Sequence, residues 1–242
     1  MRKMTPVLAV LGLALSLPST ASAQLAGGSA LVLPLSQRVP NEPQHVNTLG
    51  FEAGYATRSG EHGVLSTVRW QAERDRVTLA LAAGALLPAS GDRRSGWLAA
   101  VGLARMLRDD PQRIPSPGVS LFAGADYLRT PESGDGWDVD MPAGLALSVS
   151  APLSGWLPRL WLAPHAQLRL SHMAGSSTVA RCGGGVDLGL MVLRNRGIGP
   201  QWGVRLVYDA RVTGNPRLGP GTHYEGGIHL GIVRQARTFS GE

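Results

Sequence analysis

The feature that most constrains this chain is a series of segments of about ten residues in which apolar and polar residues alternate. This period of two predicts half-buried β-strands, because successive side chains of a strand point to opposite faces. Gly, Pro, Asp, Asn and Ser cluster between the segments and indicate turns. We count ten predicted strands, at residues 48–56, 64–72, 77–86, 97–107, 119–129, 139–150, 160–172, 179–193, 201–212 and 223–234.

The rest of the pattern predicts how these strands are connected. No segment carries the 3.6-residue apolar spacing of a long amphipathic helix, so we predict an all-β fold. An even number of short antiparallel strands favours a closed up-and-down barrel, because closure removes the exposed edges of an open sheet. We therefore predict an up-and-down antiparallel β-barrel of about ten strands, within a range of about eight to twelve.

The N-terminal residues have the pattern of a secretory signal peptide. Arg2 and Lys3 form a positive region, residues 6–17 form an apolar run, and residues 21–23 are the small residues Ala-Ser-Ala. The pattern predicts that the chain is exported from the cytoplasm. It divides the chain into a signal peptide at 1–23, a lead-in segment at 24–47, a barrel at 48–234 and a polar C-terminal tail at 235–242.

Composition excludes several classes of partner and cofactor. The single cysteine, Cys182, rules out an intramolecular disulfide and any zinc site built from several cysteines. The formal net charge is +6, yet no basic run is longer than Arg93-Arg94, so we predict no nucleic-acid partner. We also predict no cofactor and no metal.

The polar side of the strands predicts which face of the barrel is outside. A soluble barrel loads its outer face with charge, at about a quarter to a third of surface positions. Here the polar side is mostly Gly, Ala and Ser with isolated charges of both signs, which suits a crowded interior where ions pair. The apolar side would then face lipid, as in a transmembrane barrel. The predicted lumen-lining network is Glu52, Arg69, Asp126, His165, Gln167, Arg169, Asp187, Arg205, Asp209, Arg211, Glu225 and His229.

Strand pairing predicts contacts within this network. If the turn after residue 194 joins two antiparallel strands, Asp187 lies near Arg205. Across the next turn, Glu225 lies near Arg211 and Asp209. An internal salt-bridge network is therefore expected.

The last strand adds a resemblance to a known family. Glu225, Gly227, Leu230 and Ile232 have the spacing of the assembly signal in small bacterial outer-membrane β-barrel proteins, the superfamily of OmpA-, OmpX- and OmpW-like barrels. These barrels usually end on an aromatic residue, whereas this chain continues past Ile232 to Glu242. The resemblance implies a location in the cell outer membrane, with outer-membrane lipid and the barrel-assembly machinery as partners.

Catalytic patterns are weak. Ser171 and His172 are neighbours on one predicted strand and so point to opposite faces, and His165 is followed two residues later by Gln167 rather than Ser. We predict that the chain is not an enzyme, with a hydrolase at the rim of the lumen as an alternative. Asp138 and Asp140 could offer oxygen ligands to calcium, but we interpret them as a solvated strand entrance.

The predicted function follows from the barrel's size. A barrel of about ten strands has an interior that side chains largely fill. We therefore predict an outer-membrane barrel with an ion-paired lumen and a structural or surface-interaction role. The alternatives are a narrow pore for small solutes and an exported soluble β-barrel that carries a small apolar ligand.

Overall fold

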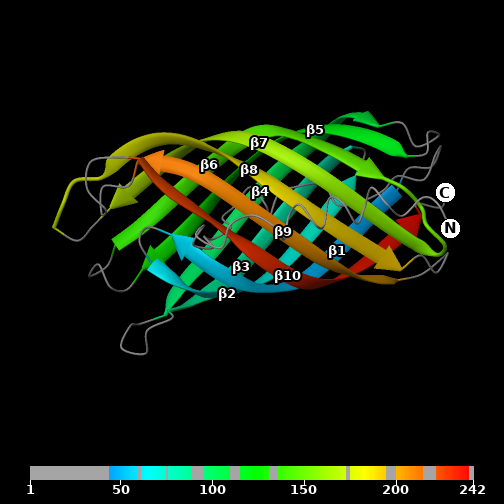
Figure 1. Cartoon of the computed structure of the whole chain (residues 1–242), viewed down its shortest axis with the longest axis horizontal. Helices are drawn as coiled ribbons and strands as arrows, with labels where there is room; N and C mark the ends of the chain where they lie inside the picture. The colour runs from blue at the N-terminus through cyan, green and yellow to red at the C-terminus, as the bar shows by residue number, and fades with distance from the viewer. Residues whose placement is uncertain are drawn as a thin grey trace, which may run out of the picture.

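The structure is a computed structural model that describes residues 44–58, 61–74, 76–88, 95–109, 115–130, 136–172, 175–194, 200–214 and 222–239. These residues form ten β-strands (Figure 1). In chain order the strands are β1 (Gln44–Arg58), β2 (Glu61–Arg74), β3 (Val77–Pro88), β4 (Gly96–Asp109), β5 (Ser116–Thr130), β6 (Gly136–Ser150), β7 (Trp156–His172), β8 (Val179–Arg194), β9 (Gln201–Gly214) and β10 (Thr222–Phe239). The described residues contain no helix with the length and hydropathy of a membrane span.

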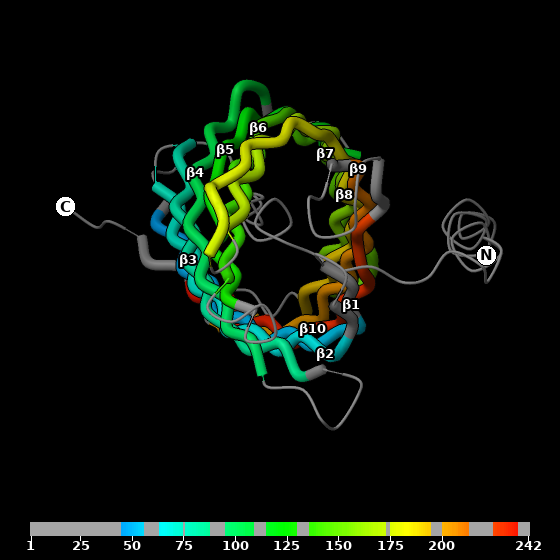
Figure 2. Tube along the Cα trace, turned by 90° about the vertical axis from the view of Figure 1, so that its left-hand side faces the viewer, coloured from blue at the N-terminus to red at the C-terminus, as the bar shows by residue number. Residues whose placement is uncertain are grey.

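The ten strands close into a single antiparallel barrel. Each strand pairs with the next one in the chain, and β10 returns to pair with β1, from Gln44 opposite Phe239 to Thr57 opposite Gly226. Seen from one end, the strands form a continuous ring (Figure 2). The predicted all-β fold with up-and-down connectivity and ten strands is confirmed.

Several observed strands are longer than the predicted ones, with differences of four or five residues at the start of β1, the start of β7 and the end of β10. Strand β1 already begins at Gln44, inside the predicted lead-in, and β10 runs on to Phe239, inside the predicted tail. The predicted signal peptide lies outside the described residues. Pairing explains the longer strands, because β1 and β10 continue each other's ladder where the sequence alternation fades.

Two prolines lie inside strands rather than at strand starts or bulges. The β5–β6 ladder has a gap beside Pro142 and the β6–β7 ladder has one beside Pro164, with the same register on both sides of each gap. Proline has no N–H to donate, so a local loss of pairing is the expected result. A register shift does occur between Met106 and Arg108, where β4 pairs with β5.

The two faces of the barrel have opposite character. Side chains alternate between buried and exposed positions along the strands, and the exposed positions carry large apolar residues such as Leu230, Ile232 and Phe51, with exposed fractions of 62%, 59% and 55%. The buried positions hold the charged residues together with an apolar cluster that includes Trp161 and Phe122. The barrel therefore has an apolar outside and a mixed inside.

Candidate functional site

The candidate site is the lumen, because the predicted charged and polar residues lie there. All twelve residues of the predicted network are buried, with exposed fractions of 7% or less. They come from seven of the ten strands, which the barrel's closure brings around one interior. Burying charges in this way costs several kcal/mol per ion unless each charge is paired. The pairing is thus what makes this interior possible.

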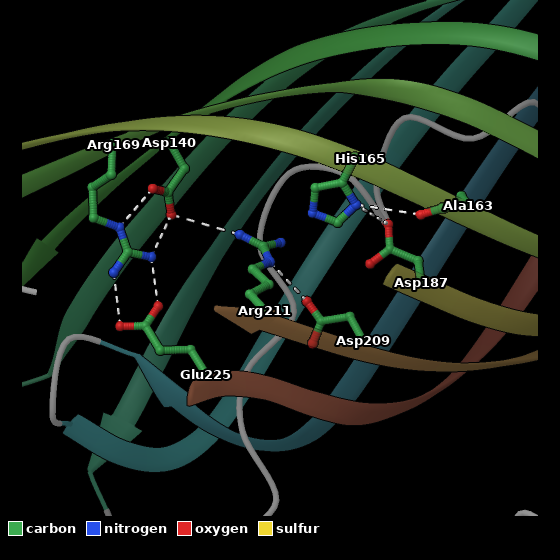
Figure 3. Close-up of polar contacts among 8 residues, drawn as sticks. All are labelled: Asp140, Ala163, His165, Arg169, Asp187, Asp209, Arg211 and Glu225. Carbon is green, nitrogen blue, oxygen red and sulfur yellow. Dashed lines mark hydrogen bonds and ion pairs between the residues drawn. The ribbon is translucent and has the colours of Figure 1, made fainter. Parts of the chain in front are cut away.

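Arg169 on β7 lies between two carboxylates. Its Nε and Nη2 donate to Asp140 Oδ1 and Oδ2 on β6 at 2.6 and 2.8 Å. Its Nη1 and Nη2 donate to Glu225 Oε1 and Oε2 on β10 at 2.7 and 2.5 Å. Each carboxylate accepts two parallel bonds, the geometry that suits a planar guanidinium. Strands β8 and β9 separate β7 from β10 in the sheet, so this contact crosses the lumen (Figure 3).

Arg211 on β9 extends the same network. Its Nε donates to Asp209 Oδ2 at 3.2 Å, and its Nη1 lies 3.6 Å from Asp140 Oδ2 (Figure 3). Asp126 and Asp187 are also near enough to interact electrostatically with the Arg211 guanidinium. Two aspartate pairs face each other across neighbouring strands, Asp126 with Asp140 and Asp187 with Asp209. Arg211 is the cation that all four carboxylates share.

A second ion-pair group bridges the β1–β10 seam that closes the barrel. Arg205 Nη1 on β9 donates to Glu52 Oε1 on β1 at 2.5 Å, and Arg69 Nη2 on β2 lies 3.2 Å from the same oxygen. The Arg205 guanidinium also lies over the Trp161 ring, 5.3 Å from its centroid, a cation–π contact. Glu52 therefore links the two arginines, and Trp161 joins them to the apolar cluster.

The remaining network residues complete the interior. His165 Nδ1 lies 3.3 Å from the Ala163 carbonyl oxygen and 3.8 Å from Asp187 Oδ2 (Figure 3). His229 and Gln167 are buried, at 4% exposure each. His165 also contacts the Phe122 ring edge, with centroids 6.3 Å apart. The polar network and the apolar cluster are thus continuous.

The apolar cluster occupies the part of the lumen next to the Glu52 group. Trp161 on β7 packs its indole against the backbone of Gly189 on β8, its register partner, where a Cβ would collide with the ring. Met191 and Leu193 lie on the same face of β8 and are 1% and 2% exposed. Glycine at position 189 is therefore what admits a tryptophan into this narrow interior.

Two sequence-based pairings have different outcomes. Glu225 lies directly opposite Arg211 in the β9–β10 register, as predicted. The prediction that Asp187 lies near Arg205 is wrong in register, because Asp187 faces Asp209 and Arg205 faces Met191. The predicted alignment failed because it assumed a different register between β8 and β9, so Arg205 meets a carboxylate of β1 instead.

Sequence reasoning misjudged one acidic pair. Asp138 and Asp140 were interpreted as a solvated strand entrance, but both are completely buried in the lumen. Asp140 then contacts Arg169 and Arg211. The signal was present, because both aspartates alternate with the apolar Val139 and Met141 in the same way as the other inward charges.

The two adjacent residues considered for catalysis, Ser171 and His172, lie on opposite faces of β7. Ser171 points inward and is buried, whereas His172 lies on the outer face, stacked on Trp137 at a centroid distance of 5.5 Å. Ser171 Oγ has no hydrogen-bond partner among the described residues. No group of His, Cys, Asp and Glu side chains in the described part of the chain is arranged to hold a metal ion. Glu132 and Asp135, upstream of Asp138, lie outside the described residues.

The four residues that resemble an assembly signal are divided between the two faces of β10. Glu225 and Gly227 are buried, and Leu230 and Ile232 are exposed on the outside. Their role in assembly stays a prediction.

Comparisons with known proteins found similarity in solved structures alone. No protein-family model matches the chain, and no curated protein matches it. The translocator domain of autotransporter NalP from Neisseria meningitidis is 8% identical, with a TM-score of 0.47 over 84% of this chain and 90% of that chain. The outer membrane protease OmpT from Escherichia coli is 7% identical, with a TM-score of 0.42 over 85% of this chain and 98% of that chain. The barrel assignment rests on the strand pairing described above.

Proposed function

We propose that this chain is an integral β-barrel protein of the bacterial outer membrane, with a lumen closed by ion pairs and apolar side chains. The observation that carries the proposal is the inverted polarity of the barrel. Buried arginines and carboxylates fill the inside, whereas leucine, valine, isoleucine and aromatic residues are exposed on the outside. Large contiguous apolar surfaces of this kind are rare on soluble monomers. In a bilayer the same surface meets hydrocarbon.

Strand length supports the same proposal. The shortest strand, β3, has 12 residues. A tilted strand needs about 9–11 residues to cross the hydrocarbon core. Every strand of this barrel is therefore long enough to span a membrane.

Aromatic residues on the outer face mark an interface with the headgroup region. Trp97, Tyr127, Trp137 and His172 follow one another across β4, β5, β6 and β7, with successive ring centroids 4.8, 6.4 and 5.5 Å apart. Such rings gather where hydrocarbon meets polar headgroups. We place one membrane boundary at this level.

The experiment that tests membrane insertion combines cell fractionation with gel mobility. We expect the full chain in the outer-membrane fraction, and a folded barrel that migrates differently before and after boiling in SDS. Boiling supplies the internal control, because it unfolds the same sample. Recovery in the soluble fraction, with no heat-dependent shift, would contradict the proposal.

The lumen favours a structural or surface-interaction role over a channel. Arg169 reaches across the interior to Glu225, and Trp161, Phe122, Met191 and Leu193 fill the neighbouring space. We expect the purified barrel to give no stable conductance in planar lipid bilayers. Stepwise currents from the refolded protein would instead favour the narrow pore.

The remaining alternatives receive less support. A soluble carrier would line an internal cavity with its Leu and Val face, and here that face lies outside. A hydrolase at the lumen rim would need a serine, a histidine and an acid within hydrogen-bond reach. Kinship with the OmpA-, OmpX- and OmpW-like barrels, and delivery by the barrel-assembly machinery, stay predictions.

A further inference from the structure

Positive and negative charges are distributed differently over the two faces of the barrel. Among the residues whose exposure the structure describes, every aspartate and glutamate is buried. The charged side chains exposed on the outside of that same part of the chain are all arginines. Among these residues, every charge on the outer surface is therefore positive.

Most of these arginines lie at one end of the barrel. We call this the terminal end, because it is where β1 starts at Gln44 and β10 ends at Phe239. Antiparallel order puts the end of β2, the end of β4 and the end of β8 at the same edge. The terminal-end arginine rim consists of Arg74, Arg76, Arg105, Arg108, Arg194 and Arg234. At the opposite edge, one arginine, Arg129, is exposed among the residues whose exposure the structure describes.

Tryptophans lie beside two members of this rim. The Arg234 guanidinium lies over the Trp202 ring, 5.8 Å from its centroid. Arg194 is the strand partner of Trp156, and both tryptophans are exposed. Tryptophan occupies the headgroup level of a membrane, so these pairs place the guanidinium groups at the depth of lipid phosphates.

We propose that the terminal-end arginine rim binds the phosphate groups of anionic glycerophospholipids. The inference rests on the proposed function, because it requires the apolar belt to lie in a bilayer. A guanidinium donates two parallel hydrogen bonds to a phosphate, and several arginines around one rim attract an anionic leaflet. An exported barrel that inserts from the periplasm keeps its terminal end on that side, where the leaflet is made of glycerophospholipid rather than lipid A.

The test uses quenching of tryptophan fluorescence by brominated lipids in vesicles that contain the refolded full chain. A Trp97→Phe, Trp137→Phe background leaves Trp70, Trp156 and Trp202 as the exposed tryptophans, all nearer the terminal end. Brominated phosphatidylglycerol is compared with brominated phosphatidylcholine at equal mole fraction. We expect phosphatidylglycerol to bind more tightly by about fivefold or more, the effect of one arginine near an anionic surface. High salt should lower this preference.

Variants then locate the preference. Arg105→Gln, Arg194→Gln and Arg234→Gln together should reduce the phosphatidylglycerol to phosphatidylcholine ratio to nearly one. The single variants Arg194→Gln and Arg234→Gln should each reduce it partly, which covers the case in which the triple variant fails to fold. The matched control is Arg129→Gln, at the opposite end, which should leave the ratio unchanged.

The outcomes separate this inference from the proposed function. Equal quenching by both lipids would overturn the inference and leave membrane insertion intact, whereas no quenching by either lipid would overturn both. A ratio that survives in the triple variant would also overturn it. Unlabelled lipid A is added in a final arm; if it relieves the quenching as well as unlabelled phosphatidylglycerol does, the assignment to glycerophospholipid is wrong.

Discussion

Arg169 holds together side chains that the sheet does not bring together. Its guanidinium donates to Asp140 on β6 and to Glu225 on β10, while β7, on which it lies, has β6 and β8 as its neighbours in the sheet. All three side chains are almost completely buried. Removing the Arg169 cation would leave the two carboxylates close together in a medium of low polarity. Two buried carboxylates without that cation destabilise the folded state, because neither charge is then compensated.

Replacing Arg169 is therefore expected to destabilise the folded barrel strongly. We expect Arg169→Met to lower the free energy of unfolding by about 3–5 kcal/mol, the usual cost of removing one partner of a buried ion pair. Arg169→Lys should cost less, because it keeps the charge but loses the two-pronged hydrogen bonding. The measurement is urea unfolding in detergent, followed by tryptophan fluorescence. The matched control is Arg108→Met, an exposed arginine; a similar loss in both variants would mean that Arg169 lies in water.

Inward orientation could be predicted from single residues, but contact partners could not. Parity along a strand tells which face a side chain occupies, and this placed Arg205 and Asp187 on the inner face correctly. Partners depend on the register between strands and on reach across the lumen. The Arg205 bond to Glu52 joins β9 to β1 over Gly231 of β10, the register partner of both residues. The contact therefore requires the register at the β1–β10 seam, which no local pattern in the sequence specifies.

At the scale of strands, the period-2 pattern predicted the strands well because each face of a strand requires its own kind of residue. A strand of this barrel has hydrocarbon-like residues on one side and small or charged ones on the other, so a shift by one residue would reverse every side chain. Alternation is therefore strict along most of β7 and β10. The ends of β1 and β10 were missed because polar rim residues interrupt the pattern although backbone pairing continues.

The outward face of β10 provides a test at this scale. Leu230 lies near the middle of the strand, between Ala53 on β1 and Leu206 on β9, and is 62% exposed. If this surface meets hydrocarbon, Leu230→Arg should destabilise the barrel in phospholipid vesicles by about 2–4 kcal/mol. Asn47→Arg, an exposed position near the start of β1, should cost only about 0–1 kcal/mol. Equilibrium folding into vesicles measures both, and equal effects would contradict a lipid-facing belt.

For the whole molecule, closure of the sheet is what allows an ionic interior. In an open sheet the inward charges would face water and would need no partners, and β1 and β10 would expose unpaired edges. With β1 paired to β10, Arg205 of β9 meets Glu52 of β1 over the single strand between them. Arg169 reaches farther, across the interior to Glu225. Ion pairing in the lumen therefore depends on closure of the barrel. The even strand count indicated closure, and the isolated charges of both signs on the polar side indicated the pairing.

Closure can be tested by cross-linking the seam between β1 and β10. Ala53 and Leu230 are register partners. Such partners have Cα atoms about 4.5–5.5 Å apart, within the range of a disulfide. In a Cys182→Ser background, Ala53→Cys with Leu230→Cys should oxidise to a covalent loop that persists after boiling and shifts gel mobility until a reductant is added. Ala53→Cys with Leu145→Cys on β6, half-way around the barrel, is the control.

An open sheet predicts no link at the seam, and a fluctuating chain predicts equal linking of both pairs. A seam-specific link, formed when the barrel is folded and lost when it is oxidised in urea, is the result that closure requires.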